Sequence, residues 1–323
     1  MVAYTGIQGQ NILIVSSDPA NPTEGQIWYN STSNLLKGYA NVVTNAWASG
    51  GNMNTARVGL GSAGTQTAAL GFGGFAPGST GATEEYDGTT WTNNPTGLNT
   101  PRYEIRGCGT QTAALAFGGE APPTGATEKY DGSTWTNTGT MNTARSDVAP
   151  AGTQTAALAF GGKIPPTSAA TESFNGTSWT TVNSMNTARQ GGGGVGLQTA
   201  ALSFGGFTAP SPRTAATESW NGTSWTSVNS MNTARYLMAS FGLQTSAVAG
   251  GGNSTAPTGA TELWNGTSWT TNPNSMGTAR YNLGGAGTQS LGVAFAGNPG
   301  PAVTNVTEEW TGAALAVRTI TTS

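Results

Sequence analysis

Two oppositely charged residue types recur in step along the chain and are the first candidates for chemistry. Only 27 of the 323 residues are charged, 12 Lys+Arg and 15 Asp+Glu, and twelve of those 27 belong to this pattern. Catalytic residues are not normally repeated six times, so we predict that each arginine and glutamate pair with each other or cap backbone groups between strands. The pattern comprises Arg57, Arg102, Arg145, Arg189, Arg235 and Arg280, with Glu84, Glu128, Glu172, Glu218, Glu262 and Glu308.

Several kinds of chemistry are excluded by residues that the chain lacks. There is no histidine, which removes Ser-His-Asp and Cys-His catalysis, histidine-ligated zinc and copper, and a histidine pH switch. The single cysteine, Cys108, aligns with small apolar positions of other repeats and is predicted to be a core residue. We therefore expect no cofactor and no metal, and classify the chain as a non-enzyme.

A few unpaired acids offer weaker alternatives. A glycosidase needs two carboxylates, for which Glu85, Glu104 and Asp147 are the spare acids within the repeats. Asp87, Asp131 and Asp147 could suggest calcium, but they do not recur in every repeat and lack the spacing of a calcium loop. The N-glycosylation pattern also occurs three times, at Asn175, Asn221 and Asn265. The preference of Asn-Gly for hairpin turns explains these three matches fully.

Composition and charge narrow the remaining classes. The pI near 5.0 and the scattered cations give no basic patch for nucleic acid. No run of 18 apolar residues exists and the N-terminal segment lacks a basic, then apolar, leader, so we expect neither membrane insertion nor signal-peptide export. With 49 Gly, 10 Trp and 36 % hydrophobic residues, the chain reads as a folded, turn-rich β protein.

Three short sequence motifs, here called words, repeat together six times over residues 45–312. The first, Met-Asn-Thr-Ala-Arg, precedes a short strand, and the second is an apolar strand that ends at Gly-Gly, where positive φ angles are permitted. The third sets Asp-Gly or Asn-Gly between an aromatic residue and a tryptophan, which is a strong hairpin signal. Each repeat therefore predicts a four-stranded antiparallel sheet, and such sheets at this period are typical of a β-propeller.

The tryptophans predict how the repeats close. Five repeats carry the outer-strand tryptophan and the last does not, but one more lies upstream of the first repeat. We therefore expect residues 45–49 to supply the outer strand of the last blade, which gives six blades. Tyr39 and Trp47 together could instead belong to a partial seventh blade, so seven blades are the alternative. We predict that all six pack between blades: Trp47, Trp91, Trp135, Trp179, Trp225 and Trp269.

These words together resemble the kelch repeat family. The resemblance rests on Gly-Gly closing the second strand, Glu-x-aromatic-Asp/Asn opening the third, the tryptophan of the fourth and Met-x-x-x-Arg before the next repeat. It implies an all-β, six-bladed kelch-like propeller over residues 45–312. Residues 1–44 are predicted to form a small β module with strands near 11–15, 26–30 and 35–40, and residues 313–323 a C-terminal tail.

Function is expected where the repeats differ. The connections after the Gly-Gly strand vary, contain prolines that lower the entropy cost of order, and are predicted to emerge on one face. We expect the binding residues to be among Phe75, Glu120, Lys163, Ile164, Phe207, Arg213 and Asn253. This mixture of apolar and singly charged side chains suits a protein or glycan partner better than a buried small molecule.

The N-terminal segment carries a second resemblance. Asn21-Pro-Thr-Glu-Gly-Gln-Ile-Trp-Tyr-Asn-Ser-Thr, followed by Leu36-Lys-Gly-Tyr39, is similar to a β element of bacteriophage tail-fibre and other virion structural proteins, particularly of marine phages. The whole chain thus resembles kelch-like phage virion proteins. That implies a virion protein, multicopy or homo-oligomeric, docked to other virion proteins through residues 1–44 and binding a host glycan or protein. The alternatives are capsid decoration and a protein–protein adaptor.

Overall fold

The computed structural model describes residues 12–42, 45–120, 122–209 and 213–320. These residues contain strands and turns and no helix, so the all-β prediction is confirmed. The chain divides into two compact units, residues 46–311 and residues 1–45 together with 312–323. No helix in the described part of the chain is long and apolar enough to cross a bilayer.

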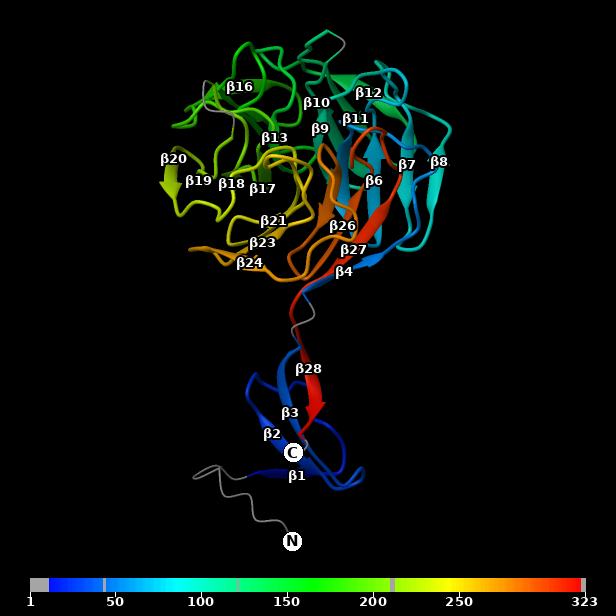
Figure 1. Ribbon diagram of the computed structural model, residues 1–323, viewed down its shortest axis with the longest axis vertical. Coiled ribbons are helices and arrows are strands. Elements are labelled where there is room, and N and C mark those ends of the chain that lie inside the picture. Colours follow the sequence, from blue (N-terminus) through cyan, green and yellow to red (C-terminus); the bar gives the residue numbers. More distant parts are fainter. Residues whose placement is uncertain (1–11, 43–44, 121, 210–212, 321–323) are drawn as a thin grey trace. The chain divides into compact units, whose positions relative to one another are not determined.

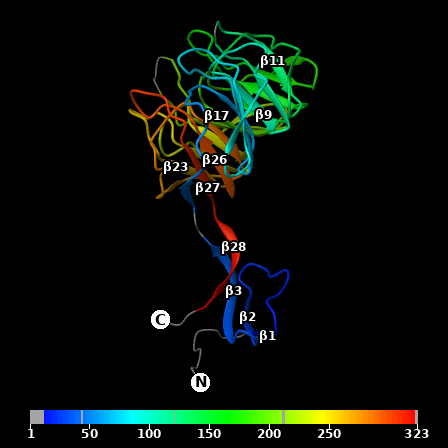
Figure 2. The same cartoon turned by 90° about the vertical axis from the view of Figure 1, so that its right-hand side faces the viewer.

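Residues 46–311 form six four-stranded antiparallel sheets, one for each sequence repeat (Figures 1 and 2). Five of them run in simple chain order from the inner to the outer strand. Their strands are β5 (Gly61–Thr65), β6 (Ala68–Phe72), β7 (Thr83–Tyr86), β8 (Trp91–Asn94); β9 (Arg106–Thr110), β10 (Ala113–Phe117), β11 (Thr127–Tyr130), β12 (Trp135–Thr138); β13 (Ala149–Gly152), β14 (Ala157–Phe160), β15 (Thr171–Phe174), β16 (Trp179–Val182); β17 (Gly193–Leu197), β18 (Ala200–Phe204), β19 (Thr217–Trp220), β20 (Trp225–Val228); β21 (Ala239–Leu243), β22 (Ser246–Gly250), β23 (Thr261–Trp264) and β24 (Trp269–Asn272).

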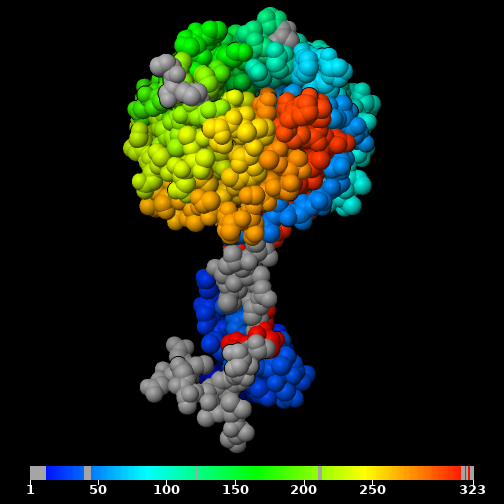
Figure 3. All heavy atoms as spheres, viewed as in Figure 1, coloured from blue at the N-terminus to red at the C-terminus, as the bar shows by residue number. Residues whose placement is uncertain are grey.

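The sixth sheet is completed from the other end of the unit. Its first three strands, β25 (Gly284–Gly287), β26 (Leu291–Phe295) and β27 (Thr307–Thr311), are joined by β4 (Ala46–Ser49), with Trp310 opposite Trp47. The predicted outer strand near residues 45–49 is therefore confirmed. In Figure 3 the blue atoms of the first repeat lie against the orange and red atoms of the last.

The structure has seven four-stranded sheets, one more than the six expected. The seventh, here called the terminal sheet, consists of β1 (Leu13–Val15), β2 (Ile27–Asn30), β3 (Leu35–Val42) and β28 (Ala314–Thr319), and lies in the other unit. Strands β1 and β2 are parallel, whereas the other pairs are antiparallel. The C-terminal segment that was expected to be a tail contributes β28 to this sheet, where it pairs with β3 along its whole length.

The hairpin and glycine signals have the predicted local structure. Tyr86 pairs with Trp91 across the turn, and the Asp87 carboxylate accepts the backbone N–H groups of Thr89 and Thr90 at 2.8 and 2.7 Å. After the second strand, Gly73 and Gly74 both have positive φ, 65° and 102°. These two glycines end the strand and turn the chain into the variable connection.

Neighbouring sheets pack through aromatic and aliphatic side chains. Trp135 lies against Phe72 of the preceding sheet with ring centroids 4.8 Å apart, and the same arrangement recurs between Trp91 and Phe295 at 4.7 Å. Those last two side chains share a buried cluster that contains residues of the first and sixth sheets. The first and last repeats are therefore packed together in the same way as consecutive ones.

Candidate recognition face

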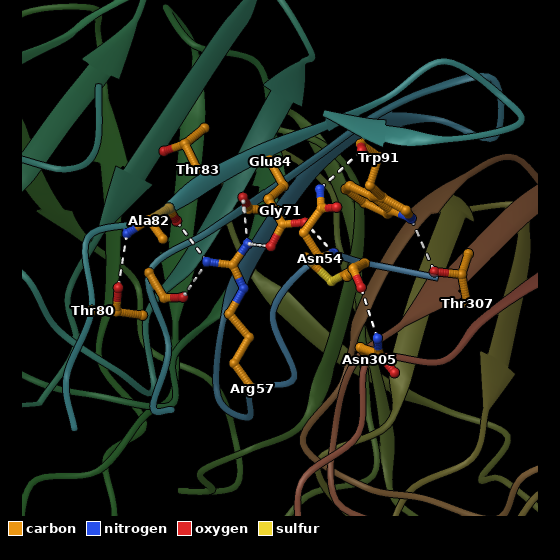
Figure 4. A network of polar contacts seen from close by, with 12 residues as sticks. Asn54, Arg57, Gly71, Thr80, Ala82, Thr83, Glu84, Trp91, Asn305 and Thr307 are labelled. Atoms are coloured by element: carbon orange, nitrogen blue, oxygen red, sulfur yellow. Dashed lines mark hydrogen bonds and ion pairs between the residues drawn. The ribbon is translucent and has the colours of Figure 1, made fainter. Parts of the chain in front are cut away.

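The six periodic arginines and glutamates are buried ion pairs within the sheets. Arg57 Nη2 lies 3.0 Å from Glu84 Oε1 and both side chains are fully buried (Figure 4). Each other periodic arginine pairs with the glutamate of its own repeat in the same way. The pairs are Arg102–Glu128, Arg145–Glu172, Arg189–Glu218, Arg235–Glu262 and Arg280–Glu308.

Backbone groups complete each pair. Arg57 Nη1 donates to the Ala82 carbonyl at 2.7 Å, and Glu84 Oε2 accepts the backbone N–H of Asn54 at 2.7 Å (Figure 4). Burial lowers the pKa of Arg57 to about 10, with the Glu84 charge opposing that shift. Because these charges are paired with each other and buried inside the sheets, they do not contact a ligand at the surface.

Two further side chains join each sheet to the preceding one. The outer-strand tryptophan indole donates to a threonine hydroxyl of that neighbour at 2.9–3.0 Å, as Trp135 does to Thr83. The glutamine of the Gln-Thr word donates to two backbone carbonyls there, as Gln66 does to Gly292 and Trp310. Sequence reasoning gave the glutamines no role, although their recurrence was visible: Gln66, Gln111, Gln154, Gln198, Gln244 and Gln289.

Six residues at the start of the inner strands, here called the mouth residues, adopt left-handed backbone conformations. Each lies two positions after a periodic arginine and has a φ between 50° and 65°. Backbone hydrogen bonds run from one to the next, for example from Asp147 N–H to the Glu104 carbonyl at 3.0 Å. The mouth residues are Gly59, Glu104, Asp147, Gly191, Leu237 and Asn282.

The residue before each mouth residue forms an isolated β-bridge with the variable connection of the same repeat. These six bridge pairs bring the predicted loop residues next to side chains that sequence reasoning missed, although their fixed place after each arginine was a usable signal. The bridge pairs are Val58–Phe75, Tyr103–Glu120, Ser146–Lys163, Gln190–Phe207, Tyr236–Asn253 and Tyr281–Asn298. Together with the mouth residues they make up the recognition face.

The second and third repeats bring a mixed cluster of charges to this face. Ser146 Oγ lies 2.7 Å from Glu120 Oε2 and 3.2 Å from Glu104 Oε2, and Lys163 Nζ lies 3.3 and 3.8 Å from the same two oxygens. A serine hydroxyl carries one hydrogen and can donate to one carboxylate at a time. Both contacts are satisfied together when one of the two glutamates carries a proton.

Electrostatics assigns that proton to Glu104. Burial and the nearby Asp147 carboxylate raise the pKa of Glu104 to about 7. Burial also acts on Glu120, but hydrogen bonds from Ser146 and Lys163 outweigh it and lower the pKa of that carboxyl. Asp147 is almost fully buried and lies 3.0 Å from Arg106 Nη2. At neutral pH the cluster therefore holds a titrating carboxyl beside fixed charges of both signs.

Two aromatic pairs, one between the first and second repeats and one between the fourth and fifth, give the face an aromatic character. Phe75 is 40 % exposed and its ring meets that of Tyr103 edge-on, with centroids 5.5 Å apart. Phe207 and Tyr236 form a second aromatic pair at 5.9 Å. The Arg213 guanidinium lies over the Tyr236 ring, with its Cζ 5.8 Å from the ring centroid.

Polar side chains border this second aromatic pair. Arg213 Nη2 donates to Asn253 Oδ1 at 3.2 Å. Ile164, half-buried, follows Lys163 in the third connection. The structure thus brings six of the predicted binding residues to bridge pairs or into contact with them, and Ile164 stands beside one.

The inner strands of the six sheets of residues 46–311 line a central cavity of about 140 Å³. Arg106 borders it and also reaches Asn282 Oδ1 of the sixth repeat, at 3.4 Å. Cys108 lines the same cavity as a buried free thiol, and burial raises its pKa to about 12. A thiol with so high a pKa is a poor nucleophile.

The remaining candidate residues have structural partners. The Asp131 carboxylate and the side-chain oxygens of Asn175, Asn221 and Asn265 accept backbone N–H groups in their hairpin turns. Glu85 accepts hydrogen bonds from Asn94 and Tyr130. Among the described residues no group of three or more His, Cys, Asp or Glu side chains could hold a metal ion.

The repeated four-stranded sheets, their packing around a cavity and the variable connections at one end define a β-propeller. The protein YjhT has a similar solved structure, with a TM-score of 0.65 over 83 % of this chain and 99 % of that chain, at 12 % sequence identity. At that identity the similarity shows the fold alone. No family model and no curated protein matches the sequence.

Proposed function

We propose that this chain is a non-enzymatic recognition protein that binds a host-surface glycan or protein through its recognition face. The observation that carries the proposal is the division of labour among side chains. The repeated arginines, glutamates, tryptophans and glutamines hold the sheets, whereas the bridge pairs differ in every repeat and place half-buried aromatic, amide and charged groups around one opening. Aromatic faces with adjacent polar groups suit stacking and hydrogen bonding to sugar rings.

The finer architecture and setting belong to the same proposal. We take residues 46–311 as a closed six-bladed, kelch-like propeller, because the tryptophan–threonine and glutamine contacts link the sixth sheet to the first as they link consecutive sheets. The resemblance of residues 21–39 to virion proteins supports placement on a phage particle, at the tail or fibres, where multivalent display strengthens weak sites. Capsid decoration and an adaptor role are the competing placements.

A glycosidase is the enzymatic alternative, because Glu104 has the raised pKa of a general acid and Asp147 lies close to it. Asp147 is 5 % exposed and bound to Arg106, which leaves its carboxylate poorly placed to act as nucleophile or base. We therefore favour binding without hydrolysis. Incubation with host polysaccharide and measurement of released reducing sugars distinguishes the two.

The binding proposal is tested by co-sedimentation of the purified protein with host cells and with their extracted polysaccharide. The double variant Phe75→Ala with Phe207→Ala removes both phenylalanines of the recognition face. It is expected to reduce binding at least tenfold without lowering the melting temperature by more than a few degrees. Leu197→Ala is the matched control, because Leu197 is 49 % exposed at the opposite end of an inner strand. Equal loss in the control, or no loss in the double variant, would refute the assignment of the face.

Placement is tested by immunogold labelling of intact particles with antibody against residues 50–312. Label at the tail or fibres supports adhesion, and label over the head supports capsid decoration. Protein found only in the lysate, with no label on particles, would overturn surface display and favour the adaptor.

A further inference from the structure

The opening at the centre of the recognition face is narrowed by backbone and by one side chain. Five of the mouth residues donate their backbone N–H to the carbonyl of a neighbouring mouth residue, at 2.7–3.0 Å. Arg106 reaches across the same opening, with Nη2 3.0 Å from Asp147 Oδ1 in the third repeat and 3.4 Å from Asn282 Oδ1 in the sixth. This arrangement favours a ligand that lies across the face over one that enters the cavity.

The two aromatic pairs of the face are three repeats apart. Each pair combines the phenylalanine that follows Gly-Gly in one repeat with the tyrosine that follows the periodic arginine in the next. Phe75 and Tyr103 join the first and second repeats in this way, and Phe207 and Tyr236 join the fourth and fifth. In the six-bladed ring proposed for residues 46–311, positions three repeats apart lie on opposite sides of the mouth.

The two halves of the face also match at the mouth residues. Phenylalanine follows the Gly-Gly pair only in the first and fourth repeats, and the mouth residue is glycine in the same two repeats, Gly59 and Gly191. In the third and sixth repeats the mouth residues are Asp147 and Asn282, which both contact Arg106. Because these positions agree, the two aromatic pairs are equivalent subsites of one face.

The surroundings of each aromatic pair suit a sugar ring. Phe75 is 40 % exposed and Phe207 is half-buried, so both rings reach the surface. A polar group adjoins each pair, since Glu120 forms the bridge pair with Tyr103 and the Arg213 guanidinium lies over the tyrosine of the second pair. Aromatic rings beside polar groups match the mixed apolar and hydroxyl surface of a sugar.

Two equivalent subsites on one face call for a ligand that offers the same group twice. A polysaccharide repeats its sugar units along one chain, so a single chain presents the same ring to both pairs. The surface of a folded protein has no such repetition. The equivalence of the two pairs therefore favours a polysaccharide over a protein ligand.

We propose that the recognition face binds one extended polysaccharide chain across the mouth, with sugar rings of that chain on the Phe75–Tyr103 pair and on the Phe207–Tyr236 pair. This inference rests on the proposed function and narrows its ligand from a glycan or protein to a polymer of repeating sugars. It also requires that one chain contact both sides of the mouth.

The test is isothermal titration calorimetry of the full chain with extracted host polysaccharide, cut by partial acid hydrolysis into fragments of increasing length. Short fragments should bind weakly, two per protein, with one on each aromatic pair. Fragments that reach both pairs should bind one per protein and about a hundredfold more tightly, because the second contact becomes intramolecular.

Two single variants test the equivalence of the subsites. Phe75→Ala and Phe207→Ala should each remove one of the two short-fragment sites and lower the affinity for long fragments to about that of short ones. Leu197→Ala is the matched control, because it removes an exposed apolar side chain at the opposite end of an inner strand and should change neither value. An unchanged melting temperature in each variant shows that the loss comes from a missing contact.

The outcomes separate this inference from the proposed function. Equal affinity at every fragment length, or a loss confined to one of the two phenylalanine variants, would overturn binding across the mouth while leaving glycan recognition in place. Binding to a host protein and to no polysaccharide would overturn the ligand class and leave a recognition protein. Failure to bind any host fraction would overturn both.

Discussion

Trp47→Ala tests whether the N-terminal strand β4 is an integral part of the propeller. The Trp47 indole donates to Thr261 Oγ1 at 2.9 Å, and its ring lies 5.3 Å from that of Trp310 and 6.2 Å from that of Phe241. Truncating a packed tryptophan costs about 3–5 kcal/mol. Because Trp47 is only half-buried, we expect the lower end, about 3 kcal/mol.

For a unit of this size, 1 kcal/mol corresponds to a shift of about 2–4 °C in melting temperature. The expected fall is therefore about 6–12 °C, measured by differential scanning calorimetry. Trp47→Phe keeps an aromatic ring and loses the hydrogen bond, so it should fall by a smaller amount. Leu197→Ala, which removes an exposed side chain, should leave the transition unchanged.

The reasoning is refuted if Trp47→Ala melts within about 2 °C of the wild type. That result would mean that β4 contributes little and that the first and sixth sheets hold together without it. A large fall shared by the Leu197→Ala control would instead show that the assay does not isolate the strand.

Three further predictions follow from the buried groups. Arg189→Ala strands the buried Glu218 carboxylate and should cost about 3–5 kcal/mol in thermal unfolding while binding to host polysaccharide stays unchanged; an unaltered melting temperature would contradict the pairing. Glu104 has a folded-state pKa of about 7 against an ordinary 4.5, so the folded protein keeps a proton that the unfolded chain loses, and stability should fall as pH rises between those values. Glu104→Gln should flatten that slope in melting curves recorded from pH 4.5 to 8, and an identical slope would count against the raised pKa. The Cys108 thiol, with a pKa of about 12, should resist a maleimide reagent at pH 8 until the protein is denatured, and rapid native labelling would contradict its burial.

The repeated contacts could be predicted because each depends on positions that recur. Arg57 and Glu84 lie in one repeat, so their pairing follows from the register of a single sheet. Trp47 could be assigned to the sixth sheet because one repeat lacked its tryptophan. In both cases the sequence period carries the three-dimensional information.

The recognition face could be predicted only in part, because its groups meet across sheets. The variable connections marked Glu120 and Lys163, but nothing in the local sequence shows that the Ser146 hydroxyl contacts both Glu120 and Glu104. Those contacts depend on how two neighbouring sheets are oriented. Pairing of β28 with β3 was missed for a similar reason, since no turn joins strands so far apart in the sequence.

The mouth residues show why we locate function at this end of the propeller. Two mouth residues, Gly59 and Gly191, are glycines, which adopt the left-handed conformation without strain. Glu104, Asp147 and Asn282 adopt the same conformation, at a backbone cost of roughly 1–2 kcal/mol for an ordinary residue and less for Asp or Asn.

Their side chains supply contacts that glycine could not. Asp147 and Asn282 hold the Arg106 guanidinium beside the cavity, and Glu104 provides the carboxyl that titrates near neutral pH. These mouth contacts differ from repeat to repeat, whereas the buried Arg–Glu pair is the same in all six repeats. Backbone strain at Glu104, Asp147 and Asn282, whose side chains differ from repeat to repeat and make polar contacts at the mouth, is the pattern expected of a binding surface.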